Sequence, residues 1–515
     1  MISLFRYMRE FKYLLAISII ICVFGCSAKQ SVDDRFVTLK VYHTNDIHSR
    51  LLPDGKHRGG LAYLASVLRI IREQDSQALI LDAGDFYKRG SMPAQKSQDE
   101  ATADILSQMS FYDARALGNN EIKVGIERFL DWSKNKEPAP IIAANFVDKN
   151  GAHVFEPYLV IKKSGLTIGL IGLTEIWSID NEFQPSTKDD AKAPYKILDP
   201  LETVGPLIVK LRPQVDVLIV VAHQAFKKNE ALAKKYPQVD LVVSGHAHQL
   251  SLDQKKLGEN MVVEAGEFGH QLGVVTVVYD KNIKKVNSLE STFWPIGEEM
   301  QVADLKIEAA IKSAYKKWAP EAFEVLTQAQ TELGVINNLN RHEGALSNFV
   351  VDLITSKNNA QVGFINSAFV REGIQKGKVL RDHLWMSIPF EDQVMTATLP
   401  RLHLQEMLQE SITSYYKNTS FVPFAFSNIK ASLKLDPLNR NLLSSKVTIV
   451  SKKDSIKVAL PSYIVNHCRE FFKEKYCPIQ AVETGVEIRK LVEETFLATK
   501  NLEAPQLNRV SVTDR

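Results

Sequence analysis

Between residues 36 and 297, short runs of apolar residues alternate with segments in which apolar residues recur every three or four positions. The runs are typical of buried strands and the segments of amphipathic helices. The predicted strands lie at 78–81, 114–117, 141–144, 167–173, 217–221, 241–243, 261–264 and 273–279, and the predicted helices at 61–74, 100–109 and 125–135. This alternation is typical of a layered α/β domain with functional residues at the strand ends.

The pattern changes after residue 297. Residues 298–330 contain a charged segment with helical periodicity at 303–318, which we interpret as a linker helix. From residue 331 to residue 515 a second α/β unit is predicted, with helices at 343–356, 403–415 and 486–499. The stretch 178–200 is rich in Asp, Pro and Lys and is predicted to be a long surface loop.

Composition adds limits to this two-domain picture. The chain has 515 residues, long enough for two or three domains, and its 45% hydrophobic and 24% charged residues are ordinary for a globular protein. A net charge of +3 gives no support to a nucleic-acid partner or to a polybasic membrane surface. We therefore expect a small-molecule partner and a monomer.

The N-terminus has a different character from the rest of the chain. Three basic residues within 6–12 precede an apolar run at 13–24, which is the pattern of a secretory signal over residues 1–25. The following Val-Phe-Gly-Cys26 resembles a bacterial lipoprotein cleavage box, with Cys26 as the acylated first mature residue. A plain cleaved signal and a retained N-terminal anchor are the alternatives. Either way we expect export to the periplasm, with membrane contact only through a lipid anchor.

Four cysteines are present, and Cys22 and Cys26 belong to this leader. The other two, Cys468 and Cys477, would pair in an oxidising compartment or remain as two reduced buried thiols. Four cysteines in this arrangement do not form a zinc-ribbon pattern, so a metal site must use His and carboxylate ligands.

Asp46 and His48 stand two residues apart, directly after an apolar strand that ends near residue 44. In extended backbone, residues i and i+2 point to the same side. A carboxylate and an imidazole on one side suit zinc, manganese or iron. By itself the pattern Asp-x-His is common, and a solvated loop with an incidental His is the alternative.

Four later strand ends carry further ligand types: Asp85 after a Gly, Asn119 after a Gly, His223, and the i, i+2 pair His246 and His248. Any one of them could be a capping or core polar residue. Five such strand ends in order are hard to assign to chance.

Together the ordered motifs resemble the calcineurin-like metallophosphoesterases. They resemble more closely the exported branch of that family, the 5′-nucleotidases and 2′,3′-cyclic phosphodiesterases, with further local matches at 44–48, 59–62, 81–85 and 265–269. The resemblance implies a four-layer αββα domain over residues 36–297 and a smaller C-terminal α/β substrate domain over residues 331–515.

The same resemblance implies two divalent metal ions, zinc or manganese. One site would use Asp46, His48, Asp85 and His248, and the other Asp85, Asn119, His223 and His246, with Asp85 bridging. Two such ions about 4 Å apart clamp a phosphate and lower the pKa of a water between them. The implied reaction is hydrolysis of a phosphate ester, with a 5′-nucleotide giving nucleoside and phosphate, by a metal-bridged hydroxide.

Asn120 and Lys123 depart from the family motif, which has a His and an Asp at these positions. The family His stabilises the transition state and helps to protonate the leaving group. Asn120, our candidate catalytic residue beside Asp85, can donate a hydrogen bond but cannot transfer a proton. General acid catalysis is worth roughly 10²–10⁴-fold, so an alcohol leaving group would suffer most, and pyrophosphate or a phenol less. Lys123 is expected at the surface, or as a cation near phosphate.

In the second domain, Arg371 matches a family arginine that grips phosphate or carboxylate with two parallel hydrogen bonds. The family glycines before it are replaced at 367–369, so the pocket floor must differ. Arg381 is a weaker candidate cation, with a surface position as the alternative.

The family binds a nucleobase between two aromatic rings. Phe426 falls at the first aromatic position and Tyr463 near the second, and Asn428 matches a base-contacting residue. Ordinary core packing is the alternative for both rings, and the expected Gly-Gly-Asp-Gly is replaced at 467–470.

The sequence therefore leaves three candidate functions. The leading candidate is two-metal hydrolysis of a phosphate ester or nucleotide. A metal- and nucleotide-binding protein with little or no turnover is the second, because both members of the His–Asp pair are replaced. Hydrolysis of a different anhydride or of a sulfur ester is the third, since a related dimanganese thiosulfohydrolase branch also departs from the His.

Overall fold

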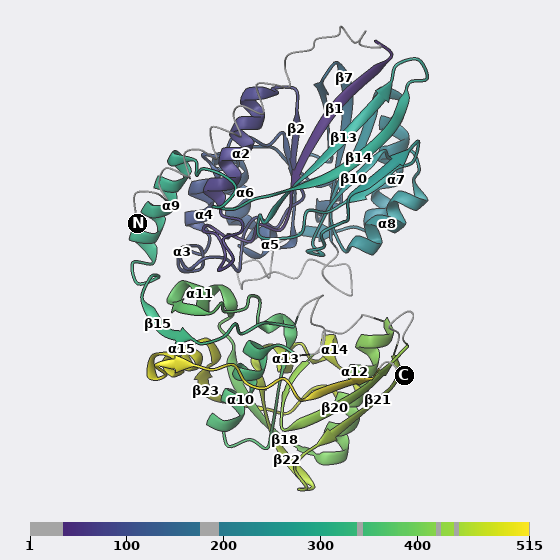
Figure 1. The fold of residues 1–515 in the computed structure, drawn as a ribbon. Coiled ribbons are helices and arrows are strands. Elements are labelled where there is room, and N and C mark those ends of the chain that lie inside the picture. The colour runs from purple at the N-terminus through teal and green to yellow at the C-terminus, as the bar shows by residue number, and fades with distance from the viewer. Residues whose placement is uncertain (1–33, 176–194, 337–342, 419–423, 437–441, 514–515) are drawn as a thin grey trace.

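The computed structural model describes residues 34–175, 195–336, 343–418, 424–436 and 442–513 (Figure 1). The predicted signal and Cys26 lie outside these residues. Within them, none of the helices combines the length and the apolar character that a bilayer crossing requires.

Two β-sheets form the centre of the N-terminal domain. The larger has the strand order β11-β14-β13-β1-β2-β3-β4, with bounds Gln254–Leu257, Lys285–Pro295, Gln271–Asp280, Phe36–Thr44, Leu79–Asp82, Ala114–Ala116 and Ile141–Ile142. The smaller has the order β12-β10-β9-β7-β6, with bounds Met261–Val263, Leu241–Gly245, Val217–His223, Leu166–Thr174 and Tyr158–Lys163. β1, β2 and β3 are mutually parallel, as are β7, β9 and β10.

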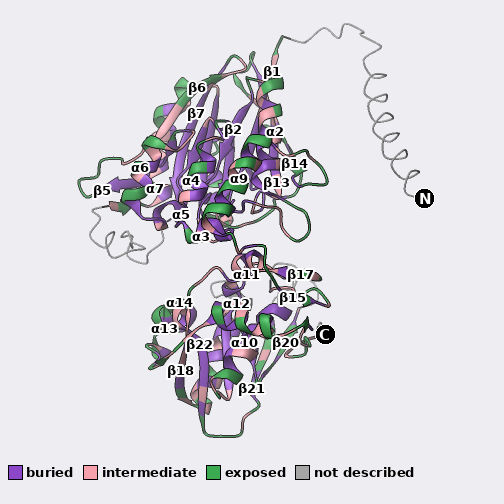
Figure 2. Ribbon diagram, turned by 90° about the vertical axis from the view of Figure 1, so that its left-hand side faces the viewer, coloured by how far each residue is buried: buried purple, intermediate pink, exposed green. Residues whose placement is uncertain are grey.

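The two sheets pack face to face, and helices cover both outer faces. Leu39 and Val41 of β1 share a fully buried cluster with Ile219 and Val221 of β9. The outer helices are α2 (Leu61–Gln74), α4 (Glu100–Leu106), α6 (Ile126–Asn135) and α9 (Leu305–Trp318) on the larger sheet, and α7 (Pro200–Leu211) and α8 (Phe226–Lys235) on the smaller. Figure 2 shows strands buried between helices whose outer sides are exposed. The four-layer αββα prediction is confirmed.

The C-terminal domain is a second, smaller α/β unit. Its main sheet has the order β19-β16-β22-β18-β23, with bounds Phe424–Ser427, Val362–Asn366, Ser455–Pro461, Gln393–Pro400 and Val482–Glu487. Two three-stranded sheets flank it, β17-β15-β24 (Gly377–Leu380, Val325–Ala329, Asn501–Leu502) and β21-β20-β25 (Leu442–Ile449, Ile429–Leu435, Val510–Thr513). The longer helices are α10 (Ala345–Lys357), α12 (Arg401–Asn418) and α15 (Ile488–Ala498).

The helix that the sequence predicts as a linker packs into the N-terminal domain. Ile307, Ile311 and Tyr315 of α9 are buried in the same cluster as α2 and α4. The strand that follows, β15, already belongs to a C-terminal sheet. The predicted surface loop at 178–200 is shorter at its end than the sequence suggests, because Tyr195–Ile197 forms strand β8 and α7 begins at Pro200. Residues 178–194 lie outside the described ranges.

A short helix of the C-terminal domain, α11 (Arg381–Ser387), docks on the N-terminal domain through polar contacts. One oxygen of the Asp382 carboxylate accepts from the Met92 amide at 2.6 Å, and the other accepts from the Tyr315 hydroxyl at 2.5 Å. The Gln95 side chain donates to the Trp385 carbonyl at 2.9 Å. These contacts place the C-terminal domain beside the loop that follows β2.

Candidate metal centre

The predicted ligands lie in the turns that follow parallel strands, and their backbone conformation is unusual. Five of the seven have a positive φ: Asp46 (52°), His48 (51°), Asp85 (58°), His246 (87°) and His248 (56°). Residues other than Gly adopt this region infrequently, although Asp and His enter it more readily than most. These turns change the direction of the chain directly after each strand, so that the predicted ligand side chains converge at the strand ends.

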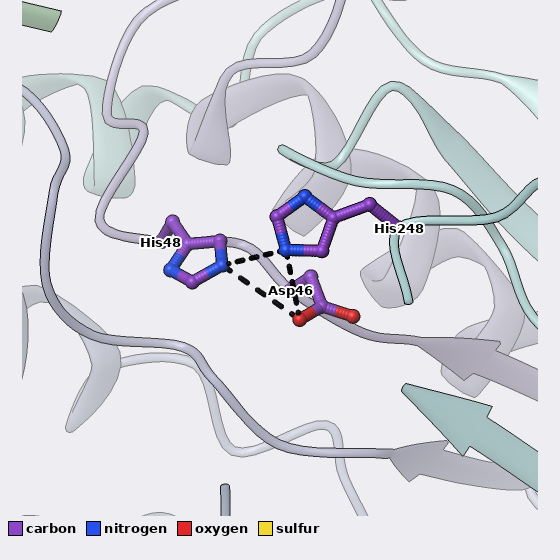
Figure 3. A group of neighbouring side chains, drawn as sticks. All are labelled: Asp46, His48 and His248. Carbon is purple, nitrogen blue, oxygen red and sulfur yellow. Dashed lines mark hydrogen bonds and ion pairs between the residues drawn. The ribbon is translucent and has the colours of Figure 1, made fainter. Parts of the chain in front are cut away.

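Asp46, His48 and His248 form one group of converging atoms (Figure 3). The Nε2 atoms of His48 and His248 are 3.1 Å apart. They lie 3.7 Å and 3.4 Å from Oδ1 of Asp46. Three lone-pair donors at these separations fit around a single cation.

Hydrogen bonds to the other polar atoms of these three side chains fix their orientation. Nδ1 of His48 contacts the Tyr87 carbonyl at 3.3 Å, and Nδ1 of His248 contacts the Glu267 carboxylate. Oδ2 of Asp46 accepts from the His246 amide at 2.8 Å. Oδ1 of Asp46 is buried without a hydrogen-bond partner among the described residues. A buried carboxylate oxygen of this kind fits a metal ligand, since such atoms otherwise find a donor.

Asp85, Asn119, His223 and His246 form the second group. Oδ1 of Asn119 lies 2.9 Å from Nδ1 of His246 and 3.2 Å from Nε2 of His223. Nδ1 of His223 contacts the Ala83 carbonyl at 2.8 Å, which leaves Nε2 directed inward. The ligand types and their separations again fit a divalent cation.

Asp85 lies between the two groups. Its Oδ2 is 3.3 Å from Nε2 of His223 and 3.8 Å from Nε2 of His48. One carboxylate therefore faces both sets of ligands. The seven residues that the sequence predicts as ligands are thus brought together by the fold as two adjacent groups.

The electrostatics of the two groups divide the four imidazoles into two classes. Burial opposes the charged form of every one of them, but in His223 the Asp85 carboxylate outweighs it and raises the pKa to about 10. Asp46 raises the pKa of His248 to about 10 in the same way. Burial lowers the pKa of His48 to about 3 and that of His246 to about 4.

These pKa values predict that metal binding is coupled to proton release. At pH 7 the metal-free protein holds protons on His223 and His248, and a cation must displace both, so about two protons leave as the site fills. Apparent metal affinity should rise with pH from 6 toward 10. Calorimetric titration of chelator-treated protein in buffers of different ionisation enthalpy measures the release. A heat of binding that is the same in every buffer would contradict the prediction, and His57→Gln, an exposed substitution, serves as control.

Asn120 and Glu121 hold Asp85 rather than facing away from it. Asn120 donates to both oxygens of the Asp85 carboxylate, from its backbone amide at 2.7 Å and from its side-chain amide. The Glu121 carboxylate accepts from the backbone amides of Asp85 and Phe86 at 2.9 Å and 2.8 Å. Burial and the neighbouring Asp85 raise the pKa of Glu121 to about 8.

Lys123 is half-buried, against the expectation of a surface position. Burial and the nearby Arg89 lower the pKa of its ammonium to about 7, while Asp85 raises it. Arg371 and Glu470 of the C-terminal domain also act on the pKa of this group, so that domain lies close to it. No local sequence signal announces that approach.

Two of the predicted C-terminal residues lie near the centre. Burial and Arg89 lower the pKa of Arg371 to about 9, and its guanidinium lies over the Phe390 ring, 5.5 Å from the centroid. Tyr463 is half-buried and stacks on His467 with centroids 4.1 Å apart. Its charge would interact with Arg89 and Arg371, so all three lie at the junction of the domains.

Phe426 and Asn428 lie away from this junction, and Arg381 at the junction has carboxylate partners. Phe426 is 3% exposed within the core of the C-terminal domain, where its ring offers no open face to a base. Asn428 is exposed just beyond β19, beside Gln361, at the end of the β16–β19 pair opposite to Asn366 and therefore to Arg371. Arg381 ion-pairs with Glu324 and Glu493. The strand register, which the sequence does not reveal, decides these positions.

Three residues at the site were not singled out from the sequence: Glu121, Arg89 and Glu267. Glu121 and Glu267 stand inside motifs at 118–121 and 265–269, where a carboxylate beside a ligand was a usable signal. Arg89 had no such signal, because it stands four residues past Asp85 in a loop with a φ of 67°.

Comparisons with known proteins agree with this geometry. Residues 39–250 match the model of the calcineurin-like phosphoesterases, and residues 325–474 match that of the 5′-nucleotidase C-terminal domain. An uncharacterised metallophosphoesterase of Bacillus subtilis is 26% identical over 57% of this chain, and the match spans 61% of that relative. The 5′-nucleotidase of Rattus norvegicus is 25% identical, with 83% of this chain and 82% of the relative covered.

Solved structures show the same fold. A 5′-nucleotidase precursor from Thermus thermophilus superposes with a TM-score of 0.78 at 21% identity, covering 93% of this chain and all of the other. A sulfate thiohydrolase from the same organism gives a TM-score of 0.75 at 15% identity, covering 93% of this chain and 97% of the other.

Proposed function

Since the chain belongs to the family that joins a calcineurin-like phosphoesterase domain to a 5′-nucleotidase C-terminal domain, we propose that it hydrolyses phosphate esters, with 5′-nucleotides as substrates and nucleoside and phosphate as products. The family is one of metal-dependent phosphoesterases. The observation that carries the proposal is the pair of ligand groups that share the Asp85 carboxylate.

The seven ligands would hold the metals as the sequence motifs imply: Asp46, His48, Asp85 and His248 on one side, and Asp85, Asn119, His223 and His246 on the other. Two divalent cations, zinc or manganese, supply activation of a water and neutralisation of phosphate charge when bound. Asn120 and Glu121 keep Asp85 in place through their hydrogen bonds to it.

The C-terminal domain supplies the other contacts that we propose. Arg371 would bind a phosphate oxygen pair through its planar fork, and Tyr463 would stack on the base. Both side chains lie at the domain junction, where Arg371 is near Arg89 and Tyr463 keeps part of its ring exposed. Phe426 and Asn428 do not enter this proposal in the conformation described.

We further propose that the protein is exported and lipid-anchored at Cys26. The basic and apolar pattern of residues 6–26 supports export. So does the disulfide between Cys468 and Cys477, because such bonds persist in oxidising compartments.

A binding protein with little turnover is the second candidate. It is favoured by one observation, that Asn120 and Lys123 occupy the positions of the family's proton-transferring pair. Asn120 donates its backbone and side-chain amides to Asp85, and an amide cannot act as a general acid.

The two candidates separate in one experiment on the mature protein. We expect about two divalent metals per chain by mass spectrometry and phosphate release from nucleotides that stops when a chelator removes the metals. Bound metals without phosphate release from any substrate would favour the binding protein. A chain that takes up no metal under any loading condition would refute both.

A further inference from the structure

Arginines at the junction of the two domains fall into two groups. Three have carboxylate partners. Arg50 ion-pairs with Glu372 at 2.6 Å, Arg489 contacts Glu391 at 3.4 Å, and Arg381 pairs with Glu324 at 2.6 Å. These pairs are expected, because a guanidinium removed from water needs a compensating charge or a set of hydrogen-bond acceptors.

Arg89 and Arg371 form the other group. Within the described ranges, neither guanidinium ion-pairs or hydrogen-bonds with another side chain, and Nε of Arg371 is buried without a partner. Both lie over one ring, that of Phe390, at 5.7 Å and 5.5 Å from its centroid. Both residues are half-buried, and a cation–π contact is weaker than the hydration that a guanidinium loses on burial.

The position of this pair relates it to the metal centre. Arg89 comes from the loop after β2, four residues past Asp85, and Arg371 follows β16 in the other domain. Burial and the charge of Arg89 lower the pKa of Arg371, and burial lowers the pKa of Arg89 although the Asp85 carboxylate raises it. Two like charges over one ring, one of them four residues past Asp85, favour a bound anion.

The chemistry of Asn120 points to the kind of anion. An alcohol leaving group must gain a proton, and Asn120 cannot supply one. A phosphate leaving group departs as a stable anion, because its second pKa is about 6. It needs positive charge rather than a proton.

We propose that Arg89 and Arg371 clamp the phosphate of an anionic leaving group, so that the preferred substrates are nucleoside polyphosphates and related phosphoric anhydrides rather than nucleoside monophosphates. The proposal rests on the proposed hydrolase function and changes its main substrate, because a polyphosphate gives a shorter nucleotide and phosphate instead of a nucleoside and phosphate. Water adds to the terminal phosphorus, the bond to the bridging oxygen breaks, and that oxygen keeps the electron pair as part of the departing phosphate. The proton of the water passes to solvent.

The test compares ADP with AMP on the metal-loaded enzyme. We expect a higher kcat/KM for ADP than for AMP, and in Arg89→Gln a fall in kcat/KM of about tenfold to a hundredfold for ADP, with a smaller fall for AMP. Arg89→Lys keeps the positive charge but not the two parallel donors of the guanidinium. Its kcat/KM for ADP should lie between those of the native protein and Arg89→Gln. Arg128→Gln, on the exposed face of α6, is the matched control.

A binding measurement, which requires no hydrolysis, also tests the arginine clamp. In chelator-treated protein, Arg89→Gln should bind inorganic pyrophosphate at least tenfold more weakly by calorimetry, while Arg128→Gln binds it as the native protein does. Equal pyrophosphate binding by native and variant protein, undetectable in both included, overturns the clamp. So does a preference for AMP that Arg89→Gln leaves unchanged. Absence of phosphate release from every substrate would refute the hydrolase function instead, while the calorimetry would still decide the clamp.

Discussion

Replacing Asp85 with Asn should leave the protein folded and remove its activity, by roughly 10³-fold or more, because the shared carboxylate contributes several kcal/mol of charge stabilisation and each 1.36 kcal/mol is about tenfold. Metal content should fall below two per chain, since Oδ2 of Asp85 faces ligands of both groups. Mass spectrometry for metal and phosphate release from a nucleotide measure the two effects.

The same substitution should change the protons of the metal-free site. Asp85 is the first charge that raises the pKa of His223, so its loss should return that imidazole toward neutrality and lower the number of protons released on metal binding. Asp253→Asn, on an exposed residue, is the control. A variant that retains two metals and native turnover would show that Asp85 does not bridge.

The double substitution Asn120→His with Lys123→Asp should raise turnover of nucleoside monophosphates by about 10²–10⁴-fold, the usual worth of a positioned general acid. The gain should depend on the leaving group: large for AMP, whose alcohol needs a proton, and small for p-nitrophenyl phosphate, whose phenol does not. Initial rates of phosphate release at saturating metal measure it.

The single substitutions provide the matched controls for this pair. Asn120→His alone should recover less, because no carboxylate orients the imidazole, and Lys123→Asp alone should recover nothing. Equal gains with both leaving groups would indicate a change in metal or substrate binding instead of proton transfer. No gain with a folded, two-metal variant would contradict the role that we assign to the missing pair.

The convergence of the candidate metal ligands could be predicted because each stands at a fixed place relative to a strand. Asp46, Asp85 and His223 follow or end apolar runs that are recognisable from composition alone. Parallel strands then bring those ends together whatever the loops do. The helix bounds were predictable for a similar reason, and α2 spans the residues that its periodicity predicts, 61–74.

The substrate side was harder to predict because it depends on contacts between distant segments. Phe426 pairs with Phe364 across β16 and β19, and that register turns its ring into the core. Lys123 and Arg89 are half-buried on the side of the N-terminal domain that the C-terminal domain approaches, and α11 docks beside the loop after β2. Neither the register nor the docking leaves a periodic trace in the sequence.

The left-handed backbone at five candidate ligands sets local stability against function. Each such residue other than Gly costs on the order of 1 kcal/mol or more, somewhat less for Asp and His. Glycine at Asp46, His48, Asp85, His246 or His248 would relieve that backbone cost but would also remove the ligand atom. The strain is therefore stored at the same positions that supply the proposed metal site.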